Sequence, residues 1–429
     1  MKVLVIGGGG REHAIIKSLK KSPRVKEIYA APGNGGIGRD ARLAAVSARD
    51  ISAMTEYAVK NKFDYVVVAP DDPLALGMVD ALEEKGIRCF GPNKAAARIE
   101  SSKVFSKNIM KKYGIPTASF ETFTDPDKAS DYLKSGNTPF PAVIKADGLA
   151  LGKGVIIADS LSQALEAVKE IMREKKFGQS GSNIVIEEYL RGHEVTVLAF
   201  TDGAHIIPMI SSMDHKRACD GDKGLNTGGM GVIAPNPYYT DEIAGVCRGK
   251  IFLPTIRALK NEGCPFKGCL YFGLMLTEKG PMVIEYNARF GDPEAQAVLS
   301  LLETDLLEIM EAVTDENLSN VNIKWKSAHA ACVILASGGY PESYKTGFII
   351  NGLDSKGGVL LSEDSGARNV IVYHSGTEYK DGSFYTNGGR VLGVTASGSS
   401  LESALENVYN AAGNINFNGM YYRKDIGRC

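Results

Sequence analysis

Three polar side chains alternate with apolar residues in segment 282–290. Glu285, Asn287 and Arg289 stand at every second position, and in an extended strand such positions share one face. A carboxylate and an amide oxygen suit Mg²⁺ that also binds phosphate, and an arginine can meet the charge of a transferring phosphoryl group or acyl phosphate. The pattern therefore indicates a catalytic strand edge. An amphipathic strand with its polar face in water would show the same alternation.

A glycine-rich hairpin with lysines is expected over residues 142–157. Lys145 falls in its first strand, and the turn carries Gly148, Gly152, Lys153 and Gly154. A Walker-type loop is excluded, because Lys153 is followed by glycine and a β-branched strand instead of Ser or Thr and a helix. Lysines on such a hairpin can still bind polyphosphate as mobile point charges. The alternative is an exposed turn without a ligand.

Two further polar segments are candidates for ligand contacts. A hydrophobic strand ends in Glu187 and Glu188, and Glu194 follows after a short turn; these acids could accept hydrogen bonds from an adenine amino group and ribose hydroxyls. They could also be ordinary surface acids. Segment 213–231 is too long and too glycine-rich for a simple hairpin, which favours a ligand loop over a disordered surface loop.

The first hundred residues alternate between short apolar strands, at 3–6, 27–31, 65–69 and 88–90, and helical patterns at 14–20 and 74–84. This order predicts a doubly wound parallel sheet. Glycine turns at 7–10 and 32–36 should meet at its carboxyl edge, where ligands bind in such folds. Because Glu12 stands at the third glycine position and no acid ends the second strand, a phosphorylated metabolite is favoured over a dinucleotide. A purely structural turn is the alternative.

Composition limits the class of protein. A chain of 429 residues predicts about two to four domains. Its 49 basic and 50 acidic residues give a net charge of −1, so the composition does not indicate a basic surface that would bind nucleic acid. The seven cysteines form no C-x-x-C pair, which argues against a zinc site and a disulfide framework. No segment resembles a signal peptide or a membrane span. We expect a cytoplasmic monomer with neither nucleic-acid nor membrane partners.

The pattern changes near residue 100 and again near residue 328. A helix is expected from about 101 to 113, ended by Gly114 and Pro116. From 328 onward, short strands at 330–336, 370–373 and 391–396 alternate with glycine turns, and a helix is expected at 401–412. This last part shows no cluster of acids, bases or nucleophiles, and its His329 and His374 fit packed or surface positions better than catalytic ones.

Several motifs stand together in an order that closely resembles the phosphoribosylamine–glycine ligases of the ATP-grasp superfamily. They are GGREHA at 9–14, PGN at 32–34, FGP at 90–92, SK at 102–103, KADGLALGKG at 145–154, DHKR at 214–217, NTGGMG at 226–231 and EYNARFGDPE at 285–294. GGRVL at 388–392 and YRKDIG at 422–427 also look like that family. The resemblance spans nearly the whole chain.

The resemblance implies a reaction and a fold. ATP, glycine and 5-phosphoribosylamine would become ADP, phosphate and glycinamide ribonucleotide through glycyl phosphate, a step of de novo purine biosynthesis. The implied fold is an α/β multidomain one: a Rossmann-like, doubly wound substrate domain at 1–101, an ATP-grasp domain at 102–326 with a mobile glycine-loop lid at about 117–190, and a β-rich, barrel-like domain at 327–429. The alternative is another ATP-grasp carboxylate–amine ligase or a carboxylase.

The resemblance also implies site residues. Glu285 and Asn287 would bind Mg²⁺ or Mn²⁺, and Arg289 would stabilise the acyl phosphate. The residues that would contact ATP are Lys103, Lys145, Gly148, Gly152, Lys153, Gly154, Glu187, Leu190 and Glu194. Those that would contact glycine or phosphoribosylamine are Gly9, Gly10, Arg11, Asn34, Asp214, Lys216, Asn226, Gly229 and Asp292.

Some features depart from the pattern or leave other functions open. Strand 269–276 lacks the additional metal-binding acid of many ATP-grasp enzymes, and Leu225 stands where the family usually has proline. The chain looks like the stand-alone enzyme, without the further purine-pathway domains fused to it in animals. A nicotinamide-dependent dehydrogenase would explain the N-terminal sheet but not its broken fingerprint. A non-catalytic nucleotide-binding regulator would have no need of Glu285, Asn287 and Arg289.

Overall fold

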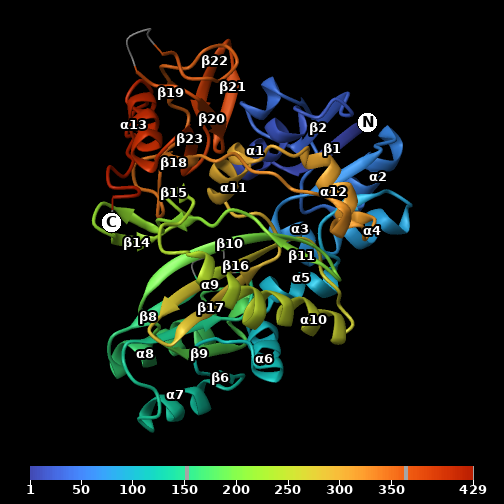
Figure 1. Ribbon diagram of the computed structural model, residues 1–429. Helices are drawn as coiled ribbons and strands as arrows, with labels where there is room; N and C mark the ends of the chain where they lie inside the picture. Colours follow the sequence, from blue (N-terminus) through green and yellow to red (C-terminus); the bar gives the residue numbers. More distant parts are fainter. Residues whose placement is uncertain (150–153, 362–365, 429) are drawn as a thin grey trace.

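The computed structural model describes residues 1–149, 154–361 and 366–428 and contains several sheets (Figure 1). The N-terminal sheet is parallel throughout, in the order β3-β2-β1-β4-β5. Its strands are β1 (Lys2–Gly7), β2 (Glu27–Pro32), β3 (Arg42–Leu43), β4 (Tyr65–Val68) and β5 (Cys89–Phe90). Its helices are α1 (Gly10–Leu19), α2 (Ile51–Asn61), α3 (Asp71–Leu76), α4 (Met78–Glu84) and α5 (Lys94–Ser101).

Helices cover both faces of this sheet. Val3 of β1 packs in one apolar cluster with Ile15 of α1, whereas its neighbour Leu4 packs in another cluster with Met54 of α2. Because successive strand residues point to opposite faces, α1 and α2 lie on opposite sides, and the predicted doubly wound sheet is confirmed. The prediction of a single helix at 74–84 is wrong, because Gly77 ends α3 and separates it from α4. Gly77 has φ +94°, a backbone conformation that glycine adopts readily.

A second sheet lies at the bottom of Figure 1, in teal and green. Its antiparallel order is β6-β9-β7-β8, with β6 (Phe120–Phe123), β7 (Ala142–Ala146), β8 (Val155–Ala158) and β9 (Ile184–Glu188), and with α7 (Pro126–Lys134) and α8 (Leu161–Val168) packed on it. Ile144 and Ile186 face these helices. The alternation of strand residues therefore puts Lys145 and Glu187 on the opposite face.

A central antiparallel sheet separates this second sheet from the N-terminal one (Figure 1). Its order is β11-β10-β16-β17. Its strands are β10 (His193–Asp202), β11 (Ile206–Pro208), β16 (Lys267–Thr277) and β17 (Gly280–Asn287), and α6 (Lys103–Tyr113), α9 (Asp241–Cys247) and α10 (Leu253–Asn261) lie near it. Ile109 of α6 and Ile256 of α10 share one buried cluster with Phe272 of β16, so helices from before and after the second sheet cover the same central face.

The remaining large sheet is also antiparallel, in the order β12-β15-β18-β23-β20. It contains β12 (Met213–Asp214), β15 (Gly231–Ala234), β18 (His329–Ala336), β20 (Val370–His374) and β23 (Arg390–Gly398), with α13 (Leu401–Ala412) against it. Within the described ranges this sheet is open and forms no closed barrel. Two of its strands, β12 and β15, precede residue 327 in the chain, so the sheet joins segments from both sides of that predicted boundary.

Smaller elements complete the fold. A hairpin pairs β13 (Arg217–Cys219) with β14 (Lys223–Asn226), and β19 (Ile349–Ile350), β22 (Ser383–Thr386) and β21 (Thr377–Lys380) form a three-stranded sheet. The short helix α11 (Glu294–Val298) follows β17 and begins the connection to the C-terminal strands. No helix in the described part of the chain is long and apolar enough to cross a lipid bilayer.

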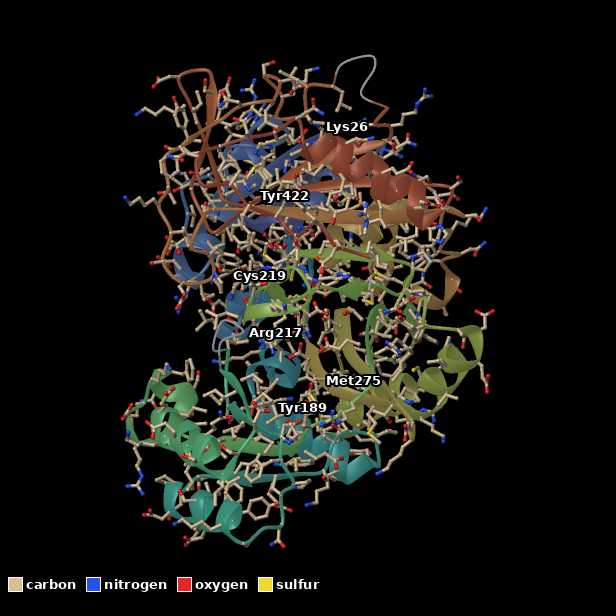
Figure 2. All side chains as sticks on the ribbon, turned by 90° about the vertical axis from the view of Figure 1, so that its left-hand side faces the viewer. Lys26, Tyr189, Arg217, Cys219, Met275 and Tyr422 are labelled. Atoms are coloured by element: carbon tan, nitrogen blue, oxygen red, sulfur yellow. The ribbon has the colours of Figure 1, made fainter. Side chains whose placement is uncertain are left out.

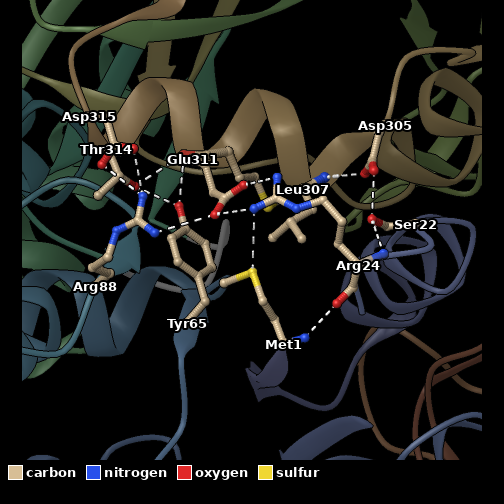
Figure 3. Close-up of polar contacts among 11 residues, drawn as sticks. Met1, Ser22, Arg24, Tyr65, Arg88, Asp305, Leu307, Glu311, Thr314 and Asp315 are labelled. Carbon is tan, nitrogen blue, oxygen red and sulfur yellow. Dashed lines mark hydrogen bonds and ion pairs between the residues drawn. The ribbon is translucent and has the colours of Figure 1, made fainter. Parts of the chain in front are cut away.

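Helix α12 (Leu306–Thr314) ties the N-terminal sheet to the rest of the molecule. Figure 3 shows Tyr65 and Arg88 reaching it from that sheet. The Tyr65 hydroxyl donates to the Met310 carbonyl at 2.7 Å, and Arg88 lies 2.6 Å from Asp315 just beyond the helix. Because the tyrosine is fully buried, its hydroxyl needs this partner, so the bond fixes α12 against the sheet.

Candidate active site

The end of β17 carries the polar pattern found in the sequence. Its register with β16 shifts once, between Gly273 and Leu274, and pairs Gly273 with Glu285 and Tyr271 with Asn287. Strand β17 ends at Asn287, so Arg289 lies in the following loop and not in the strand. Its guanidinium still donates to Asn287 Oδ1 at 3.2 Å. The predicted grouping of these polar side chains is therefore present.

Arg289 is held by a buried carboxylate that the sequence motifs did not single out. Its Nη2 lies 2.8 Å from Oε1 of Glu100, and the other oxygen of Glu100 accepts from the amide of Ala288 at 2.7 Å. Burial raises the pKa of Glu100 to about 7, against the opposing charge of Arg289. Burial acts to lower the pKa of Arg289, but Glu100 and Asp71 outweigh it and raise that pKa. The guanidinium is thus charged and fixed.

Three lysines surround Glu285. Burial acts to raise the pKa of this carboxyl, but Lys216, Lys145 and Lys103 outweigh it and hold the pKa below its ordinary value. Lys216 Nζ lies 3.8 Å from Glu285 Oε1 and 2.9 Å from Glu194 Oε2. Several positive charges in a partly buried place attract polyanions, so the arrangement can bind a polyphosphate beside the Glu285 carboxylate.

Lys103 is positioned by the start of α6. The Ser102 side chain accepts from the Phe105 amide and caps the helix, while its hydroxyl donates to Asp147 Oδ1 at 3.0 Å. Lys103 Nζ donates to the carbonyl of Gly148 at 2.8 Å. Gly148, at φ +145°, packs against Ser180 so closely that a side chain would collide with it. The predicted lysine and the predicted glycine loop therefore meet.

Asp214 lies at a closely packed position on β12. Burial and the nearby Glu294 raise its pKa well above the ordinary value, and its Oδ1 has no hydrogen-bond partner among the described residues. Gly229, at φ +106°, packs against it; a Cβ there would stand 2.6 Å from Asp214 Oδ1. A neutral or unpartnered carboxyl in this place is suited to accept a hydrogen bond from an amine.

The two glycine turns of the N-terminal sheet meet as expected, since Gly33 donates to the Gly7 carbonyl at 3.0 Å. The amide of Gly9 is already bonded to the Glu12 carboxylate at 2.6 Å. Asn34 uses its side-chain amide on the carbonyls of Gly8, at 2.9 Å, and His374, at 2.8 Å. The side chain of Asn34 thus joins the N-terminal turn to strand β20.

The loop after β17 faces the first turn of α1. Asp292 Oδ2 accepts from the Arg11 amide at 3.3 Å, and Arg11 Nη1 donates to the Phe290 carbonyl at 3.1 Å. Gly10 packs against Gln296 of α11 and Ser375, so that a Cβ on Gly10 would lie 2.5 Å from Gln296 Nε2. The predicted substrate residues at 9–11 and 292 are therefore neighbours.

Arg390 of β23 completes this corner. Its guanidinium donates to the carbonyls of Asp292, at 2.6 Å, and of Gly228. Burial acts to raise the pKa of Asp292, but Arg390 and Arg11 outweigh it and lower that pKa. The C-terminal part shows no cluster of acids, bases or nucleophiles in its sequence, but it contributes this charged side chain to the corner. The signal was present in the sequence, in GGRVL at 388–392, without a local pattern to connect it to residue 292.

The other predicted residues are distributed as follows. Glu187 lies between Lys145 Nζ, 3.0 Å from its Oε1, and Lys107 Nζ, 2.9 Å from its Oε2. Leu190 lies in the turn between β9 and β10, Glu194 is the second residue of β10, and Asn226 is exposed at the end of β14. The Gly154 carbonyl accepts from Ala146. Gly152 and Lys153 fall outside the described residues.

Figure 2 shows the molecule from the left-hand side of Figure 1, with parts of the second sheet, the central sheet and the β13–β14 hairpin at different heights. Tyr189, just after β9, lies lowest of the labelled residues near the site, Met275 of β16 lies above it, and Arg217 and Cys219 of the β13–β14 hairpin lie higher still. Strand β16 therefore lies between the end of β9 and the β13–β14 hairpin in this view.

The donor set fits a hard divalent cation that is shared with phosphate. Glu285 offers carboxylate oxygens and Asn287 an amide oxygen, and no group of three or more His, Cys, Asp or Glu side chains in the described ranges could hold a metal by itself. Mg²⁺ usually binds through one or two carboxylates plus substrate phosphates and keeps several waters. A site of this kind needs the polyphosphate for completion.

Comparisons with known proteins point to one family. Family models for phosphoribosylglycinamide synthetase match residues 1–100 (N domain), 101–295 (ATP-grasp A domain) and 330–429 (C domain). A phosphoribosylamine–glycine ligase of Caldanaerobacter subterraneus subsp. tengcongensis is 48% identical over 426 residues, which cover 99% of this chain and 99% of that protein.

Solved structures agree with these matches. The crystal structure of a phosphoribosylamine–glycine ligase from Thermotoga maritima is similar at a TM-score of 0.84 and 33% identity, and covers 99% of this chain and 100% of that chain. The biotin carboxylase domain of the Hydrogenobacter thermophilus 2-oxoglutarate carboxylase, in complex with MgADP, ADP and bicarbonate, is similar at a TM-score of 0.75 and 16% identity, over 98% of this chain and 91% of that chain. At that identity the likeness concerns the fold alone.

Proposed function

Since this chain belongs to the phosphoribosylglycinamide synthetase family, a family of ATP-dependent ligases, we propose that it joins glycine to 5-phosphoribosylamine and forms glycinamide ribonucleotide, ADP and phosphate. The observation that carries the proposal is the cluster of Lys103, Lys145 and Lys216 around Glu285, with the charged Arg289 beside Asn287. Such a cluster binds a nucleotide polyphosphate and a carboxylate acceptor together. This step belongs to purine biosynthesis.

The proposed reaction has two stages. The glycine carboxylate attacks the γ-phosphate of ATP, so that glycyl phosphate forms and ADP leaves; the amine of phosphoribosylamine then attacks the acyl carbon and displaces phosphate. Lys103 and Lys145 bind the ATP phosphates and neutralise their charge, and segment 148–154 covers them. Arg289, fixed by Glu100, stabilises the charge that grows on the transferred group.

Glu285 and Asn287 are the proposed ligands of the divalent cation, with Mg²⁺ as the first choice and Mn²⁺ as the second. When bound, such a cation withdraws charge from the phosphate oxygens and orients them. The depressed pKa of Glu285 supports this role, since the carboxylate is ionised and ready to bind a cation at neutral pH. Lys216, with its Nζ 3.8 Å from Glu285 Oε1, balances the Glu285 charge.

We assign glycine and phosphoribosylamine to the corner between α1, β12 and the loop after β17. The candidate contacts are Gly9, Gly10, Arg11, Asp214, Lys216, Gly229 and Asp292. The buried Oδ1 of Asp214, which has no hydrogen-bond partner among the described residues, supports an amine contact there. Asn34 and Asn226 are weaker candidates, because the first uses its side chain on backbone carbonyls and the second is exposed. Glu187, Leu190 and Glu194 are assigned to adenosine.

The wider organisation is proposed as well. We assign residues 1–101 to a substrate domain, 102–326 to an ATP-grasp domain with a mobile lid at about 117–190, and 327–429 to a C-terminal domain. The family matches at 1–100, 101–295 and 330–429 support similar limits. A cytoplasmic monomer without nucleic-acid or membrane partners remains the proposed state.

The decisive experiment measures ADP release with ATP, Mg²⁺, glycine and phosphoribosylamine generated in place, omitting one component at a time. We expect ADP formation to need glycine and the amine together, and mass spectrometry to detect glycinamide ribonucleotide. ADP release that depends on a different acid or amine, or on bicarbonate, and not on this pair would point to another ATP-grasp ligase or carboxylase. ATP binding without turnover would point to a regulator.

A further inference from the structure

Lys107 is a buried lysine that is paired with Glu187, bonded to Thr117 and placed over the Phe120 ring, 5.3 Å from its centroid. It lies on α6, one turn after Lys103, and its side chain is 3% exposed. Its Nζ lies 2.9 Å from Oε2 of Glu187 and donates to the Thr117 hydroxyl at 2.7 Å. A buried ammonium is unfavourable unless it is paired and hydrogen-bonded, and here burial lowers the pKa of Lys107 to about 8.

The partner of Lys107 is shared with a second lysine. Lys145 Nζ lies 3.0 Å from Oε1 of Glu187 and also donates to the carbonyl of Ile284 at 3.1 Å. One carboxylate thus faces two ammonium groups, whose side chains are 3% and 6% exposed. A single lysine would neutralise Glu187. The second one leaves a net positive charge in a place that is nearly free of solvent.

The contacts of the two lysines differ in kind. Lys107 is anchored on both sides: the Thr117 hydroxyl that accepts from it donates in turn to the carbonyl of Val283 at 2.7 Å, and Val283 donates to Pro116 at 2.8 Å. This chain of bonds joins α6, the segment before β6 and strand β17. Among the described residues no hydroxyl relays a hydrogen bond from Lys145, and Lys145 belongs to the group of lysines that act on Glu285. Of the two, Lys145 is the one placed to move toward phosphate.

We propose that Lys107 is a positioning residue, the fixed counter-ion that keeps Glu187 paired and in place when Lys145 turns from Glu187 to the phosphates of the nucleotide. This inference rests on the proposed function, in which ATP binds between the second sheet and the central sheet. A buried carboxylate that loses its only ammonium partner is strongly destabilised. With Lys107 present, Lys145 leaves without that penalty; without it, Lys145 is retained by Glu187.

The test compares ligands that differ only in their phosphates. Adenosine and ADP are titrated calorimetrically, with Mg²⁺, into the wild type and into Lys107→Met, which keeps the length of the stem and removes the charge. A hydrogen bond to a charged group changes a binding constant by about 10- to 100-fold. We therefore expect the ratio of ADP to adenosine affinity to be about tenfold lower in Lys107→Met than in the wild type. Lys112→Met is the matched control, because Lys112 lies on the same helix with its side chain 64% exposed.

Two further variants separate a positioning role of Lys107 from a packing role. Lys107→Arg should keep the wild-type ratio of ADP to adenosine affinity, because it keeps the charge. The double variant Lys107→Met, Glu187→Gln should recover that ratio, because no carboxylate charge then retains Lys145. If Lys107→Met does not fold, Thr117→Val provides the readout, since it removes only the anchoring hydroxyl; a lowered ratio is again expected. An unchanged ratio in the variant that folds, or no recovery in the double variant, would overturn the inference. Failure of the wild type to bind ADP would instead overturn the nucleotide-site assignment.

Discussion

Arg390 Nη1 donates a hydrogen bond to the backbone oxygen of Asp292 at 2.6 Å, across 98 positions of the chain. The same guanidinium bonds the carbonyls of Gly228 and, at 3.4 Å, Gly229. One side chain from the C-terminal sheet, 20% exposed, thus fixes the loop after β17 and the loop before β15 relative to each other. Both loops carry proposed substrate contacts.

Arg390→Lys should therefore impair substrate binding more than ATP binding. A lysine keeps the charge but cannot bridge several carbonyls, and each lost bond to a charged group is worth about 1.5–3 kcal/mol; we expect kcat/KM for phosphoribosylamine to fall about 30-fold. Steady-state kinetics with each substrate varied in turn measures this effect. Arg368→Lys, an exposed arginine in the same region, is the control. Equal loss for ATP and phosphoribosylamine would argue against the assignment.

Glu100→Gln tests the fixation of Arg289. The amide keeps the shape and can still accept from the Ala288 amide, but the charge that holds the guanidinium is lost. We expect kcat to fall about tenfold, less than the about 100- to 1,000-fold loss expected for Arg289→Ala, a donor at the developing charge. The KM for ATP should change little. Kinetics of both variants, with thermal unfolding to show intact folding, gives the answer; a Glu100→Gln enzyme as active as the wild type would refute a positioning role.

Removal of divalent cations should abolish ADP formation, and Mg²⁺ or Mn²⁺ should restore it. Because Glu285 is the proposed carboxylate ligand, Glu285→Gln should need a higher concentration of Mg²⁺ for half-maximal activity, by about tenfold or more. The measurement is ADP release against free metal concentration. Glu303→Gln, a change of an exposed acid outside the site, should behave as wild type. Identical metal dependence of Glu285→Gln and wild type would assign the cation to other groups.

The buried histidines between the N-terminal and C-terminal parts should make folding acid-sensitive. Burial lowers the pKa of His13 from its ordinary 6.5 to about 4, and burial with the nearby His13 lowers that of His374 to about 3. Between pH 6.5 and about 4 the unfolded chain binds protons at these two sites that the folded chain largely does not bind. The free energy of unfolding should therefore decrease as the pH falls from 6.5 toward 4, by at most about 1.4 kcal/mol per pH unit for each histidine.

Urea unfolding at pH 7 and pH 5 measures this decrease. His374→Asn removes one of the two titrating groups, so the difference in unfolding free energy between the two pH values should become smaller, whatever the variant's absolute stability. His205→Gln changes a half-exposed histidine and should keep the wild-type difference. A full pH dependence in His374→Asn would assign the acid sensitivity to other groups.

The sequence by itself determined the elements with strong local patterns. The strands at 330–336, 370–373 and 391–396 and the helix at 401–412 are confirmed within a few residues. The grouping of Glu285 with Asn287 followed from the two-residue period of a strand, and the meeting of the glycine turns followed from the geometry of a parallel sheet. The order of the motifs pointed to the family that the comparisons support.

Only the tertiary structure decided which distant groups meet. Glu100 reaches Arg289, Lys107 reaches Glu187, and Arg390 reaches Asp292. In the structure the Asn34 side chain also donates a hydrogen bond to the His374 carbonyl. Strands β12 and β15 belong to the C-terminal sheet. Local patterns report which face of an element is buried; they do not encode the partner across the interface, because that partner is fixed by the packing of whole elements and by the need to pair each buried charge.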